Sequence, residues 1–208
     1  MYIRDYLETI KKHERVVDLG CGDKPYPRAD VYVDFFESDN SQRDGAEFKP
    51  PDGKYIHWDL NTYPYPFKDK EFDFVIAGHI AEHLDDPPRF CLEVQRIGKR
   101  GYIETPNKLY EEIYGWDFHK WYVYIENNYL VFENILDRTF LGEYIRTLYH
   151  EKGDAEFIRV HDSNIRNLIT AFYWENAFPF KVIYNIRQKL SQKKHGTLLA
   201  TIKGYIWR

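Results

Sequence analysis

Two histidines and a glutamate lie within five positions of one another in the stretch AGHIAEHLDD, residues 77–86. In a helical turn, the i, i+3 and i+4 spacing would place His79, Glu82 and His83 on one face. Imidazole nitrogens and carboxylate oxygens are suitable ligands for a divalent metal ion. An imidazole also titrates near neutral pH, as a general base requires. The stretch therefore predicts either a metal site or a histidine base.

The elements that must position this stretch are short apolar runs separated by loops or helices. Strands are predicted at residues 15–20, 30–36, 55–60, 72–78 and 101–106, and a helix at residues 87–98. Such an order indicates an open, mainly parallel α/β sheet. Ligands of these sheets bind outside the carboxyl ends of the strands, which is where the histidine-rich stretch begins.

The second half of the chain is less regular. The pair Asn127-Asn128 predicts a hairpin within residues 121–134, because asparagine tolerates the positive φ of a tight turn. Helices are predicted at residues 139–153 and 162–175, the second with Asp162 or Ser163 as N-cap, and a further one at residues 2–12 near the start of the chain. Closing strands are predicted at residues 180–186 and 196–207, with a basic loop between them. No repeat or linker divides the chain, so residues 1–208 are expected to form a single domain.

A glycine turn follows the first predicted strand in VVDLGCGDKPYP, residues 16–27. Gly20 and Gly22 let the backbone turn sharply and approach a ligand where a Cβ atom would clash. Acidic residues stand near the carboxyl ends of the next two strands, Asp34 and Asp59. The pattern predicts a ligand-binding loop at the same edge of the sheet.

This run resembles motif I of the class I S-adenosylmethionine-dependent methyltransferases, and the resemblance extends over about residues 14–107. It implies a Rossmann-like methyltransferase fold that uses S-adenosylmethionine as cofactor. By resemblance, Asp18 holds the loop and the methionine end, Asp34 binds the ribose, and Asp59 with Leu60 meets the adenine. The implied cofactor-binding residues are Asp18, Gly20, Cys21, Gly22, Asp34, Asp59 and Leu60.

A nicotinamide dinucleotide is the alternative ligand, because its fingerprint also joins a glycine turn to an acidic residue that binds a ribose. In this sequence Asp23, Lys24 and Pro25 follow the second glycine, so the third glycine is missing. The segment before the second strand is also too short for the usual first helix. A dinucleotide is therefore not favoured, although the short segment departs from most methyltransferases too.

The stretch with two histidines is similar to the E-x-x-E-H motif of two metal-dependent groups. These are the methyltransferases of the terminal 2′-hydroxyl of small RNAs and the ubiquinone-biosynthesis O-methyltransferases. His79 stands in place of the first glutamate, whereas Glu82 and His83 match directly. Residues 104–107, ETPN, resemble a segment of the RNA enzymes that precedes a further metal-binding histidine, for which His119 is the counterpart. The resemblance implies Mg²⁺ or Mn²⁺ bound by these three residues and His119.

The alternative to a metal site stays open. The sequence E-H-L also follows the fourth strand in many methyltransferases without a metal, where the two polar residues cap and pack a turn. Aromatic neighbours such as Trp116 and Trp121 could likewise make His119 a packed core histidine. Without a metal, the candidate catalytic residues are His79, His83 and His119, acting as bases.

The composition of the chain favours some classes of methyl acceptor over others. The 208 residues include 29 basic and 33 acidic side chains, for a formal charge of −4, without the basic clusters that bind RNA backbones. A nucleic-acid partner is therefore not favoured. A metal can be chelated by the adjacent hydroxyls of a sugar, and aromatic residues, 18% of the chain, suit the faces of sugar rings as well as a core. The EHL and ETPN motifs together also resemble methyltransferases of surface-polysaccharide or glycan biosynthesis.

The principal hypothesis is an S-adenosylmethionine-dependent O-methyltransferase of a sugar hydroxyl in glycan or polysaccharide biosynthesis, assisted by a divalent metal. The alternatives are a metal-independent small-molecule methyltransferase with a histidine base, an RNA ribose 2′-O-methyltransferase, and a non-catalytic partner subunit. Two cysteines in different elements, with no signal sequence and no apolar run of about 20 residues, predict a cytoplasmic protein without a membrane span.

Overall fold

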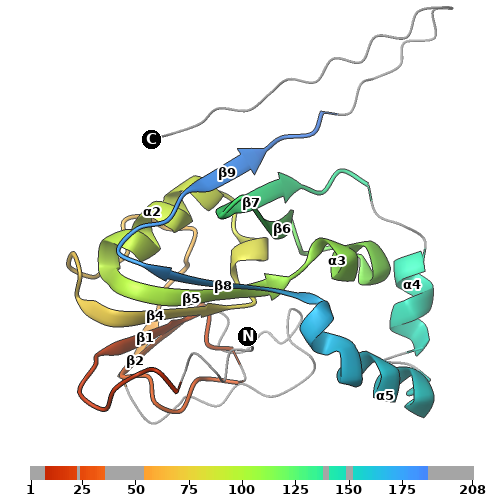
Figure 1. Ribbon diagram of the computed structural model, residues 1–208, viewed down its shortest axis with the longest axis horizontal. Coiled ribbons are helices and arrows are strands. Elements are labelled where there is room, and N and C mark those ends of the chain that lie inside the picture. Colours follow the sequence, from red (N-terminus) through yellow and green to blue (C-terminus); the bar gives the residue numbers. More distant parts are fainter. Residues whose placement is uncertain (1–7, 23, 36–53, 138–140, 149–151, 187–208) are drawn as a thin grey trace, which may run out of the picture.

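The computed structural model describes residues 8–22, 24–35, 54–137, 141–148 and 152–186. Its main feature is a six-stranded sheet in the order β3-β2-β1-β4-β5-β8 (Figure 1). The strands are β1 (Val16–Leu19), β2 (Val31–Asp34), β3 (Lys54–His57), β4 (Phe72–Gly78), β5 (Gly98–Pro106) and β8 (Ile169–Glu175). The first five are parallel and β8 is antiparallel to β5. The 3-2-1-4-5 order is that of doubly wound sheets, so the predicted Rossmann-like, mostly parallel α/β fold is confirmed.

The central strands are buried because both of their faces carry apolar residues. All four residues of β1 and of β2 are buried, as expected for parallel strands covered on both sides. Helix α2 (Pro87–Ile97) covers one face through a stripe of buried residues, Phe90, Cys91, Val94 and Ile97. Its start is fixed by Asp86, whose side chain accepts a hydrogen bond from the Arg89 backbone N–H. The helix predicted at this place is therefore confirmed.

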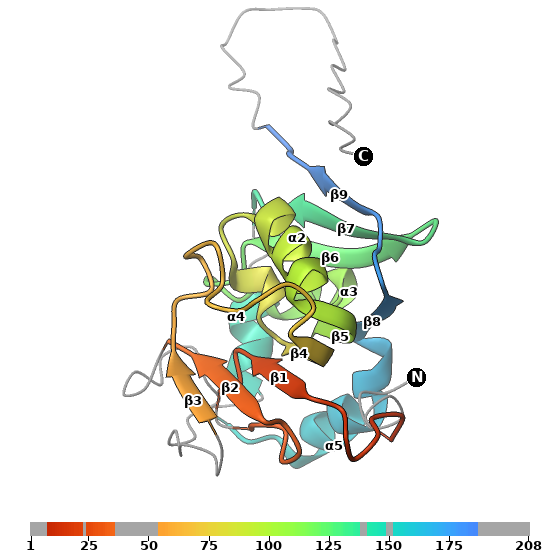
Figure 2. The ribbon, with the colours of Figure 1, turned by 90° about the vertical axis from the view of Figure 1, so that its left-hand side faces the viewer.

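A second, three-stranded sheet has the order β6-β7-β9, formed by β6 (Trp121–Glu126), β7 (Tyr129–Asn134) and β9 (Phe180–Ile183). The hairpin between β6 and β7 turns at Asn127 and Asn128, with φ of 49° and 65°, which confirms the prediction from the Asn-Asn pair. Buried residues of this sheet, of α2 and of the large sheet form one hydrophobic cluster. Figure 2 shows the small sheet on the same side of the large sheet as α2.

Short helices complete the described part of the chain. They are η1 (Ala81–His83), α3 (Lys108–Tyr114), α4 (Leu141–Arg146), α5 (Ala155–Asn164) and η3 (Ile165–Asn167). Helix η1 directly follows β4, and α3 follows β5, so both stand at the carboxyl ends of parallel strands. Figure 1 shows α3, α4 and α5 gathered beyond the end of β5. None of the described helices is long and apolar enough to cross a membrane.

The prediction of a helix at residues 162–175 is wrong. Helix α5 begins earlier, with Asp154 as N-cap instead of Asp162 or Ser163, and residues 169–175 form strand β8. Along β8 the buried residues alternate with less buried ones, because alternate side chains point to opposite faces of the sheet. Pairing with β5 therefore outweighs the helical interpretation.

Two further predictions concern the ends of the chain. Residues 8–12, at the end of the helix predicted for residues 2–12, are not helical, and the rest of that helix lies outside the described residues. The closing strand predicted at 196–207 and the basic loop before it also lie outside them.

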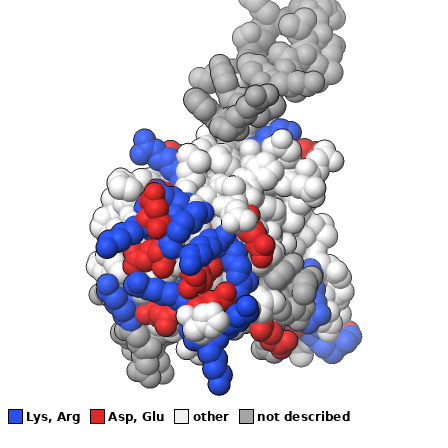
Figure 3. All heavy atoms as spheres, turned by 60° about the vertical axis from the view of Figure 1, so that its left-hand side comes forward, with Lys and Arg blue, Asp and Glu red and all other residues white. Residues whose placement is uncertain are grey.

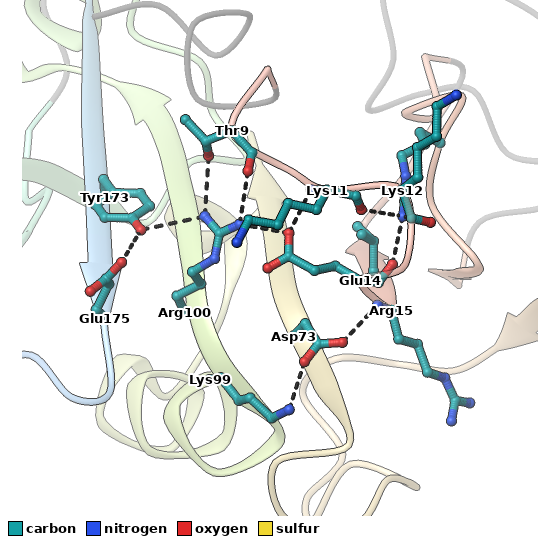
Figure 4. A network of polar contacts seen from close by, with 12 residues as sticks. Thr9, Lys11, Lys12, Glu14, Arg15, Asp73, Lys99, Arg100, Tyr173 and Glu175 are labelled. Atoms are coloured by element: carbon teal, nitrogen blue, oxygen red, sulfur yellow. Dashed lines mark hydrogen bonds and ion pairs between the residues drawn. The ribbon is translucent and has the colours of Figure 1, made fainter.

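Polar contacts hold the segment before β1 against the amino-terminal ends of the strands (Figure 4). Arg100 on β5 donates hydrogen bonds to the Glu14 carboxylate at 2.8 Å, to Thr9 at 3.1 and 3.2 Å and to the Tyr173 hydroxyl at 3.4 Å. The Asp73 carboxylate accepts from Lys99 at 2.6 Å and from the Arg15 backbone N–H at 2.8 Å. These residues, Thr9, Glu14, Arg15, Asp73, Lys99, Arg100 and Tyr173, are called the amino-edge network below.

Candidate cofactor and metal site

The glycine turn after β1 has the backbone that the sequence predicts. Gly20 and Gly22 have φ of +71° and +52°, a region that favours glycine. A Cβ atom on Gly20 would lie 2.9 Å from the Ile80 side chain, whereas one on Gly22 would have no neighbour closer than 4.0 Å. The backbone N–H groups of Gly20 and Cys21 both donate to the Val33 carbonyl, which ties the turn to β2. Both positions of the turn therefore favour glycine by their φ, and Gly20 does so also through its contact with Ile80, whereas the space beside Gly22 is open.

Two carboxylates hold this turn in place. An Asp34 oxygen accepts a hydrogen bond from the Gly22 backbone N–H at 2.7 Å, and an Asp18 oxygen accepts one from Tyr26 N–H at 2.8 Å. Both residues are buried. Burial raises the pKa of Asp18 to about 7, and the nearby Asp34 charge adds to the rise. The two strand ends thus bring acidic groups to the open side of the glycine turn, as the cofactor prediction requires.

The other predicted cofactor residues contribute in different ways. The side chains of Cys21 and Leu60 are buried in the hydrophobic core, so these residues can offer only backbone groups to a ligand. Asp59 lies two residues beyond the end of β3, and its carboxylate accepts a hydrogen bond from the Asn61 N–H at 2.8 Å. An open glycine turn beside two buried carboxylates fits a polar nucleoside cofactor such as S-adenosylmethionine.

A second group of polar side chains lies beyond the end of β4. One ligand atom from each of Glu82, His83 and His119 lies within 4.8 Å of the other two. Glu82 and His83 come from η1, whereas His119 comes from the loop between α3 and β6, 36 positions after His83. The structure therefore brings together three of the four residues predicted to bind a metal. We call Glu82, His83 and His119 the Glu82 cluster.

The Glu82 carboxylate is buried without a hydrogen-bond partner. The residue has 0% of its surface exposed, and neither carboxylate oxygen accepts a hydrogen bond. The Nδ1 atom of His83 is buried without a partner as well. A buried unpaired carboxylate costs several kcal/mol unless a cation lies next to it. The Glu82 carboxylate and the His83 imidazole, together with the neighbouring imidazole of His119, fit the ligand set of a divalent metal.

The protonation states favour metal binding. Burial alone would raise the pKa of Glu82, but the nearby histidines, His79 first among them, hold it below its usual value, so the carboxylate is ionised at neutral pH. Burial lowers the pKa of His83 to about 4, despite the adjacent Glu82 carboxylate. The His83 ring is therefore neutral at pH 7 and has a lone pair to donate.

The loop that carries His119 is fixed to η1 by several contacts. The Lys120 backbone N–H donates to the Glu82 carbonyl at 2.7 Å, and the Trp121 indole N–H donates to the Leu84 carbonyl at 2.7 Å. The ring of Phe118 stacks on that of His83, with centroids 5.5 Å apart. Because these contacts flank His119 on both sides, the loop holds its backbone close to Glu82.

The structure places His79 differently from the other predicted ligands. Its ring nitrogens face two carboxylates, with Nε2 3.2 Å from Glu104 and Nδ1 3.7 Å from Glu82, and its φ of 53° is left-handed. Burial by itself lowers its pKa, but these two carboxylates raise it to about 10. About half of the His79 side chain is exposed, at 52%. The ring therefore acts as a cation between two acids, and its place as a fourth ligand stays a prediction.

Sequence reasoning missed three polar residues next to the predicted ones. The Tyr102 hydroxyl donates to Glu104 at 2.5 Å, and Glu104 in turn contacts His79. A Glu111 oxygen lies 2.5 Å from His119 Nδ1. Glu104 stands within the quoted ETPN motif, so its position at a strand end was a usable signal. Glu111 carried no such signal, because its contact with His119 depends on how α3 ends.

One protein-family model matches the central part of the chain. Residues 17–103 match the family model described as a methyltransferase domain. This segment runs from β1 into β5 and includes η1. The segment, less than half of the chain, is therefore similar to a methyltransferase domain, in agreement with the predicted class. S-adenosylmethionine as the cofactor of this chain is part of the proposed function. No curated protein matches the chain.

Several solved structures are similar to the chain. An S-adenosylmethionine-dependent methyltransferase from Archaeoglobus fulgidus is 19% identical, with 83% of this chain and 90% of that chain covered and a TM-score of 0.47. The YcgJ protein from Bacillus subtilis is 21% identical, with 50% of each chain covered and a TM-score of 0.38. A methyltransferase from Thermotoga maritima is 19% identical, with 50% of each chain covered and a TM-score of 0.38. The chain thus spans about half the length of the latter two proteins.

Proposed function

We propose that the protein transfers a methyl group from S-adenosylmethionine to a sugar hydroxyl, in glycan or polysaccharide biosynthesis, with a divalent metal bound by Glu82, His83 and His119. The observation that carries this proposal is the Glu82 carboxylate, which is fully buried, has no hydrogen-bond partner and lies beside two imidazoles. The glycine turn of residues 20–22 supports the cofactor part, because it stands at the same carboxyl edge of the sheet.

The glycine turn and the Glu82 cluster would have separate roles in the reaction. The turn at Gly20 and Gly22 would hold the cofactor, with Asp34 near the ribose, and the bound cofactor supplies the methyl group. Glu82, His83 and His119 would bind a metal, which lowers the pKa of a coordinated hydroxyl and orients it. The proton of the coordinated hydroxyl would pass to solvent water, so the chain would need no dedicated base at the reacting oxygen.

The ligand set favours a metal softer than Mg²⁺. Magnesium prefers oxygen ligands in octahedral geometry, whereas two of the three groups here are imidazoles. We therefore propose a transition-metal ion rather than Mg²⁺, with Mn²⁺ as the first ion to test. This preference narrows the sequence-based expectation, which allowed either ion.

The acceptor is proposed from chemistry that a metal can recognise. A vicinal diol chelates an ion through two oxygens, and sugars carry such pairs. Phe118 is stacked between His83 and Trp116, with centroids 5.5 and 5.4 Å away, and the partly exposed Trp116 would suit the apolar face of a sugar ring. Figure 3, which brings the amino-terminal ends of the parallel strands forward, shows basic side chains interspersed with acidic ones on that face. We also propose that the protein works in the cytosol.

The experiment begins with calorimetry on metal-stripped protein. We would titrate S-adenosylhomocysteine first and then Mn²⁺ or Mg²⁺, comparing wild type with His83→Ala, Asp34→Ala and His13→Ala. Loss of Mn²⁺ binding only in His83→Ala, and weaker cofactor binding only in Asp34→Ala, supports the two-part site. His13 is the matched control, because it is exposed and outside both groups. Equal loss of both ligands in one variant would indicate a damaged fold instead.

Transfer of labelled methyl groups then tests the acceptor. The panel would pair vicinal-diol sugars with deoxy sugars that lack one of the two hydroxyls, each with and without a chelator. We expect transfer only to the diols, lost on chelation and restored by Mn²⁺. Unchanged transfer in metal-free protein would remove the metal and favour a histidine base, whereas salt-sensitive binding of short RNA would favour the ribose 2′-hydroxyl.

A further inference from the structure

We infer that Glu111 is a positioning residue for the metal site, because its carboxylate fixes the ring of His119 with Nε2 turned toward Glu82 and His83. The inference rests on the proposed metal and deepens it, since it names the residue that sets the tautomer and the orientation of one ligand. Nothing in the sequence motifs points to Glu111.

The contact between the two side chains is short and buried. Glu111 Oε1 lies 2.5 Å from His119 Nδ1, and their side chains are 0% and 7% exposed. A carboxylate at this distance requires the proton of a neutral imidazole to sit on Nδ1. The lone pair is then on Nε2, the nitrogen on the far side of the ring. A metal-binding histidine commonly has such a carboxylate on its second nitrogen.

The ends of α3 explain how Glu111 reaches His119. The helix starts at Asn107, whose side chain accepts from the Tyr110 N–H and donates to the Asn167 carbonyl, so its first turn is anchored. It ends at Gly115, which has φ of 57° and ψ of 53° and reverses the chain. The reversal allows a residue on the helix to face one that follows it by only eight positions.

Packing alone does not account for a carboxylate at this place. Burying a charge is costly, and an apolar residue of similar volume would fill the space with less penalty. The backbone of the His119 loop is already held by the contacts of Lys120 and Trp121 with η1. The His119 ring also packs edge-on against the rings of His83 and Phe118, with centroids 4.7 and 4.9 Å away. These ring contacts do not select which nitrogen carries the proton, whereas the Glu111 carboxylate on Nδ1 does.

The test compares Glu111→Gln and Glu111→Ala with Glu112→Gln, a matched change at the next position of α3. Mn²⁺ affinity of the full chain, saturated with S-adenosylhomocysteine, is measured by calorimetry, and the visible spectrum of bound Co²⁺ reports the ligand geometry. We expect the affinity to fall about 10-fold in Glu111→Gln and up to about 100-fold in Glu111→Ala, with a changed Co²⁺ spectrum. Glu112→Gln should leave both unchanged.

The outcomes separate this inference from the proposed function. If wild type binds Mn²⁺ and both Glu111 variants bind it equally well with the same Co²⁺ spectrum, Glu111 has no positioning role and the metal site stands. If wild type binds no metal, the metal part of the proposed function and this inference both fail. Binding of S-adenosylhomocysteine shows which variants are folded. If Glu111→Ala is not, the nearly isosteric Glu111→Gln decides the result.

Discussion

Charged residues gather at both ends of the large sheet, but the two groups differ in how they are paired. At the amino-terminal ends, Arg100 and Asp73 each have several hydrogen-bond partners within the amino-edge network (Figure 4). At the carboxyl-terminal ends, Glu82 is completely buried and neither of its oxygens accepts a hydrogen bond. The same residue types thus form direct hydrogen bonds at one edge, whereas at the other the Glu82 carboxylate has looser contacts with the rings of His79 and His83, at 3.7 and 3.9 Å.

The difference indicates where function limits stability. Hydrogen bonds to charged groups contribute about 1.5–3 kcal/mol each, whereas a buried carboxylate with only looser contacts stabilises the folded state less. A sequence under selection for stability alone would have replaced the whole Glu82 cluster by apolar residues. The unpaired group therefore marks the edge at which a cation is expected, and the following predictions test this contrast.

The largest effect is expected from Glu82→Gln. Loss of the central ligand should lower Mn²⁺ affinity and methyl transfer by at least about 100-fold, because the metal would lose its only anionic ligand in the cluster. The metal-free variant should also lose stability at neutral pH, because the neighbouring histidines hold the pKa of Glu82 below its usual value and the folded state thus favours the ionised carboxylate. Urea denaturation measures the second effect. A variant at least as stable as wild type would show that these histidines do not compensate the Glu82 charge without a metal.

Metal binding should supply the stability that the cluster lacks. At a free Mn²⁺ concentration of 100 times Kd, the free energy of unfolding of wild type should rise by about 2.7 kcal/mol, because the ion binds only the folded state. Glu82→Gln should show no rise at the same concentration. Thermal unfolding with and without a chelator measures both. An equal rise in the two proteins would place the ion elsewhere.

The elements of the fold differ in how well the sequence predicted them. The five parallel strands of the large sheet were predictable because each is a short apolar run that ends in a turn, such as residues 72–78. Glu82 and His83 were found because they are neighbours in the chain. The helix predicted at residues 162–175 failed because β8 is selected by its pairing with β5, a contact that local spacing does not encode.

The partners of the candidate ligands were harder to predict than the ligands. His119 was named from its order after the ETPN motif, and the structure brings it to Glu82. Glu111 was not named, because its contact with His119 requires the left-handed end of α3 at Gly115. The role expected for His79 as a ligand assumed a regular helical turn, whereas His79 itself has a left-handed φ and η1 is a 3₁₀ helix. Local pattern finds candidate groups, and the backbone turns decide which of them meet.

A third carboxylate at the functional edge, Asp18, should make stability depend on pH. Its pKa is raised in the folded state to about 7, so its ionisation destabilises the protein as the pH rises from about 4 to 7, and its contribution is most favourable at low pH. In cofactor-free Asp18→Asn this dependence should be smaller, by about 2 kcal/mol between pH 5 and pH 8. Urea denaturation across this range measures it. Parallel plots of the free energy of unfolding against pH for variant and wild type would show that ionisation of Asp18 does not lower stability.

At the opposite edge, Glu14→Gln applies the same chemical change as Glu82→Gln to a paired carboxylate. Glu14 accepts from Arg100 at 2.8 Å and from the Lys11 backbone N–H at 2.7 Å, so loss of its charge should cost about 1–2 kcal/mol of stability. Mn²⁺ affinity should not change. The two glutamine variants thus differ in their effect on the metal, and the contrast between the edges would fail if both lost metal binding or if neither did.

The smallest effect is expected from Lys99→Ala, within the amino-edge network itself. Lys99 donates to Asp73 at 2.6 Å, but its side chain is 58% exposed, so water competes for both charges and salt screens them. Asp73 also keeps its hydrogen bond from the Arg15 N–H. The loss in free energy of unfolding should therefore be less than about 1 kcal/mol, and smaller still in 1 M salt. A loss as large as that of Glu14→Gln would mean that pairing, rather than burial, sets the strength of the amino-edge contacts.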